Sequence, residues 1–203
     1  MPIDHWFPTS VYYKDQILEN RLDEYRKLAY ELVDYDRLHP FWESKLKSSF
    51  HAGSAGMLQD DPRFYELAAE ALYYSQDFAR FLGYDENTIS NMYIENMWVN
   101  VISGNDYHGL HSHPGSIISG VFYVDAPEEA TLVIGSPQRR DFYPIRPQDE
   151  NDYSCESAEY PCVPGRMILF RSGTDHGYDA HGSERDKISI PFNVTCDRLQ
   201  KHR

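Results

Sequence analysis

Residues 107–124 read Tyr-His-Gly-Leu-His-Ser-His-Pro-Gly-Ser-Ile-Ile-Ser-Gly-Val-Phe-Tyr-Val. His111 and His113 are two positions apart in this stretch, and alternate residues of a β-strand point to the same face of its sheet. Two imidazoles on one face can converge on a single metal ion and leave a place for a third ligand. His176 is the candidate for that place, because it ends a segment, residues 163–176, that reads as strand, turn, strand. The stretch therefore predicts a three-histidine metal site on a β-sheet.

The sequence around this motif indicates a mainly β half. Short runs rich in β-branched and aromatic residues begin after Asn91, and turn-forming residues separate them. The expected strands cover residues 92–101, 116–124, 130–134, 166–170 and 187–194. Their short, even spacing favours a sandwich or jelly roll. Residues 146–161, which are rich in prolines and acids, are expected to form a surface loop or a lid.

The residues before this half are expected to be helical. Apolar residues recur at spacings of three and four from Lys14 to Tyr35 and again up to Leu82, where Gly83 is a plausible stop. We predict an α+β chain that is mainly β and forms one structural domain. In it, residues 1–91 form a helical region that packs on a β core of residues 92–203.

The charge and the cysteines restrict the partners and the compartment. The chain has 203 residues, with 32 Asp and Glu against 19 Lys and Arg, and a formal net charge of −13. This excess repels phosphate backbones and anionic lipid, so we expect neither nucleic acid nor a membrane as a partner. The three cysteines lack metal-finger spacing, and neither an export signal nor an apolar run of 18 residues is present. We therefore expect a cytoplasmic protein.

Three parts of the β-rich half resemble one family. The first two are residues 97–101 and residues 107–124, and the third consists of the two runs 164–176 and 184–193. Together with the opening Trp6-Phe7-Pro8-Thr9, they are similar to the 2-oxoglutarate and iron(II) dependent oxygenases of bacteria and their phages. The resemblance covers about residues 92–196. It implies a double-stranded β-helix, the jelly-roll barrel also found in cupins, whose mouth holds iron.

The resemblance implies a place for each metal ligand. In the wider superfamily a His-x-Asp/Glu pair on one strand and a distal histidine on another strand hold the iron. His111 takes the first place and His176 the distal place. The middle place falls on His113, where the superfamily usually has a carboxylate. Asp106 and Asp125, on either side of the motif, are the alternatives for it.

The same resemblance implies a cation that binds the far carboxylate of 2-oxoglutarate. The superfamily places an arginine or lysine about ten residues beyond the distal histidine. Lys187 is 11 residues past His176, and Arg185 is 9 residues past it. We favour Lys187, which begins a Lys-Ile-Ser segment ending at Ser189, although the guanidinium of Arg185 offers a bidentate fork. Tyr123 is a further candidate for a hydrogen bond to the co-substrate.

The chain is thus expected to use iron(II), 2-oxoglutarate and O₂ to hydroxylate a small molecule or a protein side chain, as a monomer or a homodimer. His108, in a glycine-flanked turn, is expected at the rim of the site. Two alternatives stay open: a cupin-like enzyme with three histidine ligands, and a barrel that binds metal without catalysis. Cupins usually carry a glutamate shortly after the H-x-H pair, whereas this chain continues Pro114-Gly115-Ser116, which counts against the first alternative.

Overall fold

The computed structural model describes residues 2–4, 6–34, 47–50, 57–137 and 151–197. Its strands are β1 (Val11–Lys14), β2 (Lys47–Ser48), β3 (Met92–Met97), β4 (Asn100–Ile102), β5 (His108–His111), β6 (Ile118–Asp125), β7 (Thr131–Gly135), β8 (Ser157–Pro161), β9 (Met167–Arg171), β10 (His176–Tyr178) and β11 (Lys187–Cys196). Its α-helices are α1 (Leu22–Asp34), α2 (Tyr65–Phe81) and α3 (Glu86–Ser90). Short 3-10 helices are η1 (Glu19–Arg21), η3 (Leu58–Asp60) and η4 (Pro62–Phe64).

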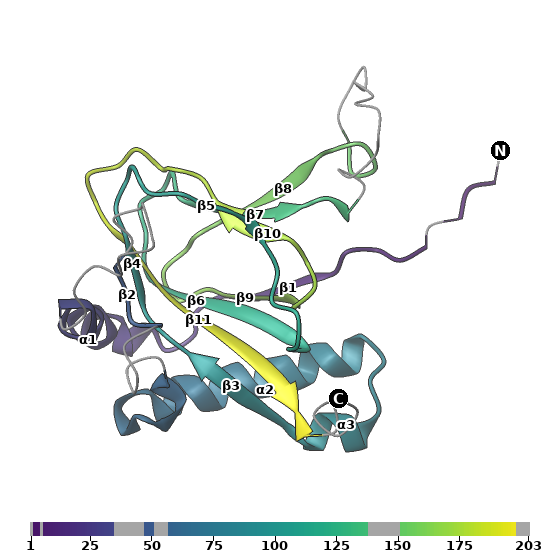
Figure 1. Ribbon diagram of the computed structural model, residues 1–203, viewed down its shortest axis with the longest axis horizontal. Helices are drawn as coiled ribbons and strands as arrows, with labels where there is room; N and C mark the ends of the chain where they lie inside the picture. The colour runs from purple at the N-terminus through teal and green to yellow at the C-terminus, as the bar shows by residue number, and fades with distance from the viewer. Residues whose placement is uncertain (1, 5, 35–46, 51–56, 138–150, 198–203) are drawn as a thin grey trace.

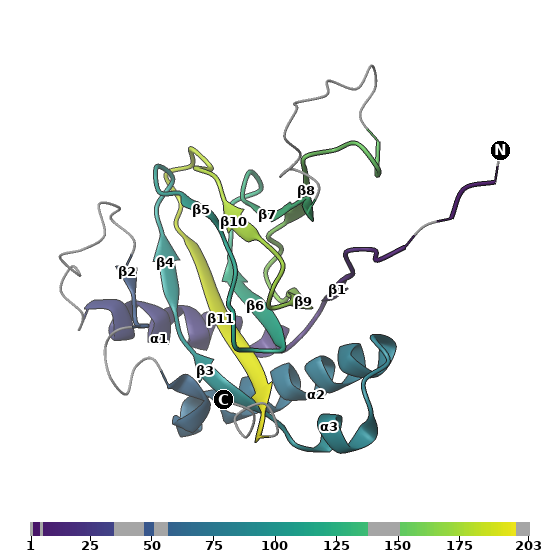
Figure 2. The same ribbon diagram turned by 45° about the vertical axis from the view of Figure 1, so that its right-hand side comes forward.

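The strands form two antiparallel sheets that face each other (Figures 1 and 2). The larger sheet has seven strands in the order β1-β9-β6-β11-β4-β2, with β3 paired to the other end of β11. The smaller sheet has four strands in the order β5-β10-β7-β8. This arrangement is a double-stranded β-helix, so the predicted jelly roll is confirmed.

The helices cover the outer face of the larger sheet. Both α1 and α2 run across it in Figure 1, and their buried side chains form one apolar core with residues of β6, β9 and β11. Tyr25 of α1 stacks on Phe64 at 5.5 Å between ring centroids and meets Phe122 of β6 edge-on at 6.3 Å. The α-helices of the N-terminal part therefore pack on the larger sheet, whereas β1 and β2 from the same part of the chain belong to that sheet.

A second, smaller apolar cluster fills part of the space between the two sheets. Val121 and Tyr123 of β6 meet Leu132 and Ile134 of β7 there, together with Phe170 of β9. On the larger sheet these positions alternate with residues that face the helices, as strand geometry requires. Polar side chains on the same inner face continue this layer toward the three histidines.

The first helix is shorter than the sequence pattern predicts. The pattern covers Lys14 to Tyr35, whereas Lys14 ends β1 and α1 begins only at Leu22. Gln16 and Leu18 have positive φ angles of 63° and 47°, which interrupt any helix. The segment between them is tied to the β core, because the backbone N–H of Ile17 donates to the carbonyl oxygen of Gly165 at 2.9 Å.

Two further expectations about the strands are wrong in part. The single strand expected over residues 92–101 is divided, because β3 and β4 pair with different ends of β11. The loop or lid expected over residues 146–161 ends in strand β8, which pairs with β7 along its whole length. The proline that closes β8 is compatible with an edge strand, which needs no donor on its outer side. Residues 146–150 lie outside the described part of the chain.

Candidate metal centre

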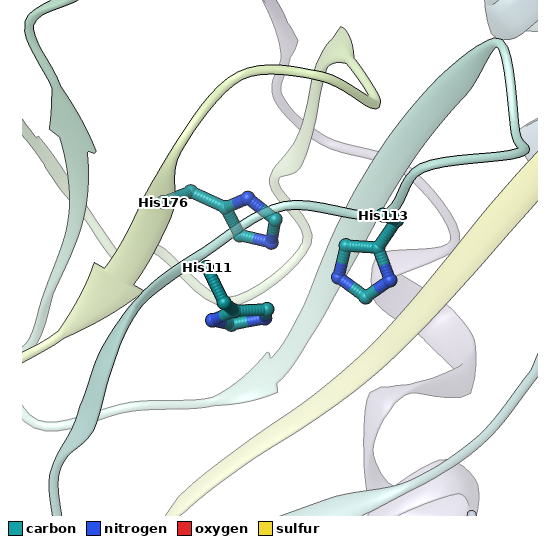
Figure 3. A group of neighbouring side chains, drawn as sticks. All are labelled: His111, His113 and His176. Atoms are coloured by element: carbon teal, nitrogen blue, oxygen red, sulfur yellow. The ribbon is translucent and has the colours of Figure 1, made fainter.

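The three predicted histidines come together at one end of the smaller sheet (Figure 3). His111 of β5 lies directly opposite His176 of β10 in the antiparallel pairing. His113 follows the end of β5 and is held by its backbone N–H, which donates to the carbonyl oxygen of Ser172 at 2.8 Å. One ligand atom from each of the three lies within 4.8 Å of the others. His111 and His113 were expected on one strand. His111 lies on β5 and His113 lies in the loop after it, yet their side chains converge with that of His176.

A β-bulge adds a fourth histidine to this group. His108 lies opposite Tyr178, and His111 lies opposite His176, so two residues of β5 face the single residue Gly177 of β10. The extra residue places His108 on the same side of β5 as His111, with ring centroids 4.0 Å apart. The turn expected for His108 is therefore wrong: it lies on a strand, stacked on a candidate metal ligand.

Gly177 allows this close approach of β5 and β10. A Cβ atom at position 177 would lie 2.4 Å from the carbonyl oxygen of His108. We expect Gly177→Ala to destabilise the fold by about 1–3 kcal/mol, since the backbone of β5 must move away. Chemical denaturation measures this loss, with Gly173→Ala as the matched control because a Cβ there meets nothing within 4 Å. Equal stability of the two variants would contradict the tight approach.

Hydrogen bonds orient two of the three rings. Nδ1 of His111 lies 3.0 Å from the carbonyl oxygen of Gly109, and Nδ1 of His176 lies 2.9 Å from that of Thr174. A carbonyl oxygen only accepts, so each Nδ1 carries the ring proton. The lone pair of each Nε2 is then available to a metal ion, which is the arrangement that metal-binding histidines commonly show.

Burial favours the neutral form of two candidate ligands, His176 and His113. Loss of hydration lowers the pKa of His176 to about 3, although its hydrogen bond to Thr174 acts in the opposite direction. Burial, followed by the nearby His111, lowers the pKa of His113 to about 4. Neutral imidazoles are the form that binds metal, and three nitrogen donors suit iron(II) and other first-row divalent ions. The residues present therefore fit such an ion.

The alternative carboxylates lie elsewhere. Asp106 accepts hydrogen bonds from the backbone N–H of Ser103 at 3.2 Å and from its hydroxyl at 2.7 Å. Asp125 forms ion pairs with Arg26 and Arg185. Within the described residues, neither carboxylate has an oxygen in the group of ligand atoms that contains the three histidines.

Of the two candidate cations, Lys187 lies inside the barrel. It is 2% exposed, and its Nζ lies 3.7 Å from the ring centroid of Tyr178, which belongs to the opposite sheet. Burial lowers the pKa of Lys187 to about 8. In the described part of the chain no carboxylate forms an ion pair with this ammonium. Arg185 instead precedes β11, is more than half exposed and pairs with Asp125.

Other polar side chains share the interior with Lys187. Ser189 pairs with Asn100 of β4 on one side and with Tyr123 of β6 on the other. The hydroxyl of Tyr123 forms a hydrogen bond with the thiol of Cys162, and burial raises the pKa of both groups.

We define Asn100, Tyr178, Lys187 and Ser189 as the interior polar cluster. Oδ1 of Asn100 and the hydroxyl of Tyr178 are buried and have no hydrogen-bond partner among the described residues. Sequence reasoning missed both. The alternation of side chains along a strand could have identified both residues as facing the interior. Tyr178 is two positions from His176 on one strand, and Asn100 lies between two apolar residues that face the helices.

A groove of about 370 Å³ opens beside this group. His108, Leu110 and Tyr178 are among the residues that line it. Glu156 and Asp179 contribute carboxylates to its wall. The groove gives a surface route that reaches side chains next to the histidines.

A double-stranded β-helix with three converging histidines is an arrangement that could hold a non-haem metal ion. Residues 96–193 match a family model described as "Putative 2OG-Fe(II) oxygenase". The β-rich part of the chain is therefore similar to the 2-oxoglutarate and iron(II) dependent oxygenases. The matched region contains all three histidines and Lys187.

Solved structures show the same fold at low sequence identity. HygX from Streptomyces hygroscopicus, with nickel, 2-oxoglutarate and hygromycin B bound, is 12% identical with a TM-score of 0.64, covering 93% of this chain and 84% of that one. The α-ketoglutarate dependent epimerase SnoN from nogalamycin biosynthesis is 13% identical with a TM-score of 0.62, covering 93% and 77%. EvdO2 from Micromonospora carbonacea var. aurantiaca is 12% identical with a TM-score of 0.57, covering 93% and 87%.

A search of curated proteins gave no match. Among the described residues, no helix combines the length and the apolar character that crossing a membrane requires.

Proposed function

We propose that this protein is a hydroxylase that holds iron(II) with His111, His113 and His176 and binds 2-oxoglutarate through Lys187. One observation carries the proposal: the ligand nitrogens of three histidines converge, and the buried ammonium of Lys187 has no carboxylate partner among the described residues. Iron(II) with bound 2-oxoglutarate supplies the activation of O₂ for oxidation of a C–H bond. The protein positions these groups and keeps water away from them.

The interior polar cluster provides the chemistry for a dicarboxylate. The Lys187 ammonium, which lies over the ring of Tyr178, would pair with the far carboxylate. Asn100 and Ser189 add hydrogen-bonding groups on the same inner face. Arg185 is a weaker choice, because Asp125 already neutralises it at the surface. The hydroxyl of Tyr123 is engaged by Cys162, so we assign Tyr123 to the wall of the site.

The absence of a carboxylate ligand changes the charge of the centre. With three neutral ligands a divalent ion keeps both of its positive charges, whereas the usual carboxylate would remove one. A dianionic co-substrate would compensate this charge. Binding of iron and of 2-oxoglutarate should therefore be strongly cooperative.

The substrate is a small molecule or a protein side chain. HygX was crystallised with hygromycin B, which supports a small-molecule substrate in this fold. The carboxylates of Glu156 and Asp179 in the groove, with a net charge of −13, oppose a polyanion.

We expect no saturable binding of single- or double-stranded DNA or RNA, even at low salt. A titration with labelled oligonucleotides measures it. Binding that saturates and weakens steeply as salt rises would contradict this expectation, because phosphate contacts release counterions. The cationic positions Arg139, Arg140 and residues 198–203, which would be the first to examine in that case, lie outside the described residues.

A cytoplasmic location fits the cysteines. Cys155, Cys162 and Cys196 are all free, as in a reducing compartment. The boundary between residues 1–91 and 92–203, and the option of a homodimer, stay predictions.

The decisive experiment is anaerobic loading with iron(II), followed by measurement of succinate formed from 2-oxoglutarate under O₂. Succinate formation supports the proposal. Metal binding without succinate would point to the barrel that binds metal without catalysis, or to a cupin-like enzyme with a different reaction.

A further inference from the structure

A row of polar side chains crosses the larger sheet next to His113. Asn193 of β11 pairs with Asn96 of β3 on one side and with Ser119 of β6 on the other. Asn193 is 4% exposed and Ser119 is 2% exposed. Polar groups at such depth are costly unless each finds a hydrogen-bond partner, so their contacts define a specific arrangement. We call Asn96, Asn193 and Ser119 the polar row.

The polar row is fully connected. Nδ2 of Asn193 donates to Oδ1 of Asn96 at 2.8 Å, and the Ser119 hydroxyl lies 2.6 Å from Oδ1 of Asn193. The same hydroxyl lies 2.9 Å from that of Ser172, whose carbonyl oxygen accepts the backbone N–H of His113. Nδ2 of Asn193 also lies 3.3 Å from Nδ1 of His113.

This last contact distinguishes His113 from the other two histidines. Nδ1 of His111 and of His176 each faces a carbonyl oxygen, whereas Nδ1 of His113 faces an N–H donor. It therefore accepts, and the proton of the neutral ring is on Nε2. Figure 3 shows that one ring nitrogen of His113 points toward the other two histidines and the other toward β11. The nitrogen that faces the metal position thus carries the proton in this arrangement.

A second arrangement moves that proton without moving the rings. A 180° rotation of the Asn193 amide exchanges its nitrogen and oxygen. Oδ1 then accepts from Nδ1 of His113 and from the rotated amide of Asn96, while Nδ2 donates to Ser119, which donates to Ser172. The contacts of Asn193 with Asn96, Ser119 and His113 are kept in both arrangements, with donor and acceptor exchanged. Only the second leaves the lone pair of His113 Nε2 available to a metal ion.

We propose that Asn193 is a positioning residue for the metal centre, which selects the tautomer of His113 by rotation of its amide. The inference rests on the proposed function, because it takes His113 as a ligand. His113 occupies the position where the superfamily usually has a carboxylate ligand. In the second arrangement the Asn193 amide oxygen accepts a hydrogen bond from this histidine, and its partial negative charge replaces part of the charge that a carboxylate would provide. The polar row couples this choice to β3 and β6.

Metal affinity of matched variants tests the proposal. Equilibrium dissociation constants for Zn(II) are measured for the intact protein and for Asn193→Ala, Asn193→Asp and Asn96→Ala. Asn193→Ala should weaken binding by about 10- to 100-fold, the usual cost of losing an outer partner of a ligating histidine. Asn193→Asp should bind at least as tightly as the unchanged protein, because a carboxylate only accepts and fixes the required tautomer. Asn96→Ala should have a smaller effect of the same sign.

Thr195→Val is the control for damage to β11. Thr195 is buried on the same strand and pairs with β3, away from His113. Its substitution should leave zinc affinity unchanged. Three outcomes would each overturn the proposal. They are unchanged zinc affinity in Asn193→Ala, zinc affinity in Asn193→Asp as weak as in Asn193→Ala, and a loss of zinc affinity in Thr195→Val equal to that in Asn193→Ala.

A second readout reports the tautomer directly. Nitrogen-15 spectra of the imidazoles should show the proton of His113 on Nε2 without metal and on Nδ1 with Zn(II), whereas His111 and His176 keep it on Nδ1 throughout. The same tautomer for all three without metal would overturn the proposal. A zinc-binding protein that shows this switch but forms no succinate would refute the proposed function and leave this inference standing.

Discussion

His176→Ala is expected to abolish tight metal binding and succinate formation. His176 is the most buried of the three histidines, and its ring lies 4.4 Å from that of His111 between centroids. Loss of a ligand should exceed the roughly 10- to 100-fold cost of losing an outer hydrogen bond, so we expect more than about 100-fold weaker Co(II) or Zn(II) binding. The absorption of bound Co(II) measures the affinity, and succinate measures the activity.

His108→Ala is the informative control for that loss. His108 stacks on His111, and burial lowers its pKa to about 4, yet it is outside the group of ligand atoms. Its removal should leave the metal stoichiometry at one ion per chain. A loss of metal in His108→Ala equal to that in His176→Ala would mean that the ligand set is different.

The middle ligand has its own test in the same assay. His113→Ala should lose metal, whereas Asp106→Ala and Asp125→Ala should keep it, because both carboxylates are engaged elsewhere. If His113→Ala kept full stoichiometry while either aspartate variant lost it, the middle ligand would be a carboxylate and the assigned triad would be wrong.

Sequence periodicity predicted the elements that local residues determine. The amphipathic stripe of α2 and the alternation of side chains between the two faces of β6 follow from spacing alone. The start of α1 could not be predicted in this way, because the apolar spacing continues through Ile17 and Leu18. There the backbone turns to meet Gly165, a residue about 150 positions away in the sequence.

The same distinction, between features set by local sequence and features set by strand pairing, applies to the candidate site. The three histidines could be predicted because the pair His111 and His113, with His176 farther along the chain, is a recognisable sequence pattern. The bulge that turns His108 inward depends on how β5 registers against β10, and no property of residues 108–111 alone specifies it. Likewise, Asn100 and Tyr178 join the interior polar cluster only through pairing between strands that are distant in sequence.

Lys187→Met is expected to weaken 2-oxoglutarate binding and to stabilise the fold. Loss of a hydrogen bond to a charged group costs about 1.5–3 kcal/mol, which corresponds to a roughly 10- to 150-fold higher dissociation constant. Fluorescence or calorimetric titration of the metal-loaded protein measures this. The matched control is Arg185→Met, which removes a surface cation bound to Asp125 and should change the dissociation constant little.

The stability gain follows from the pKa of the buried ammonium. Its ordinary value of 10.5 falls to about 8 on burial, so between these values the unfolded chain binds more protons than the folded one. Stability of the unsubstituted protein should therefore rise as pH increases from about 8 to 10.5, and below pH 8 the whole cost, roughly 3 kcal/mol, is present. Methionine fills similar space without a charge and removes that cost at pH 7.

Affinity and stability should thus change in opposite directions in Lys187→Met, a combination that simple damage to the fold does not produce. The unsubstituted protein should also lose 2-oxoglutarate affinity as the pH of the titration rises above about 8, because the neutral amine no longer attracts a carboxylate. Unchanged affinity in Lys187→Met together with lost affinity in Arg185→Met would transfer the role to Arg185. A destabilised Lys187→Met variant would instead mean that the ammonium has a partner in the fold and is not held ready for an anion.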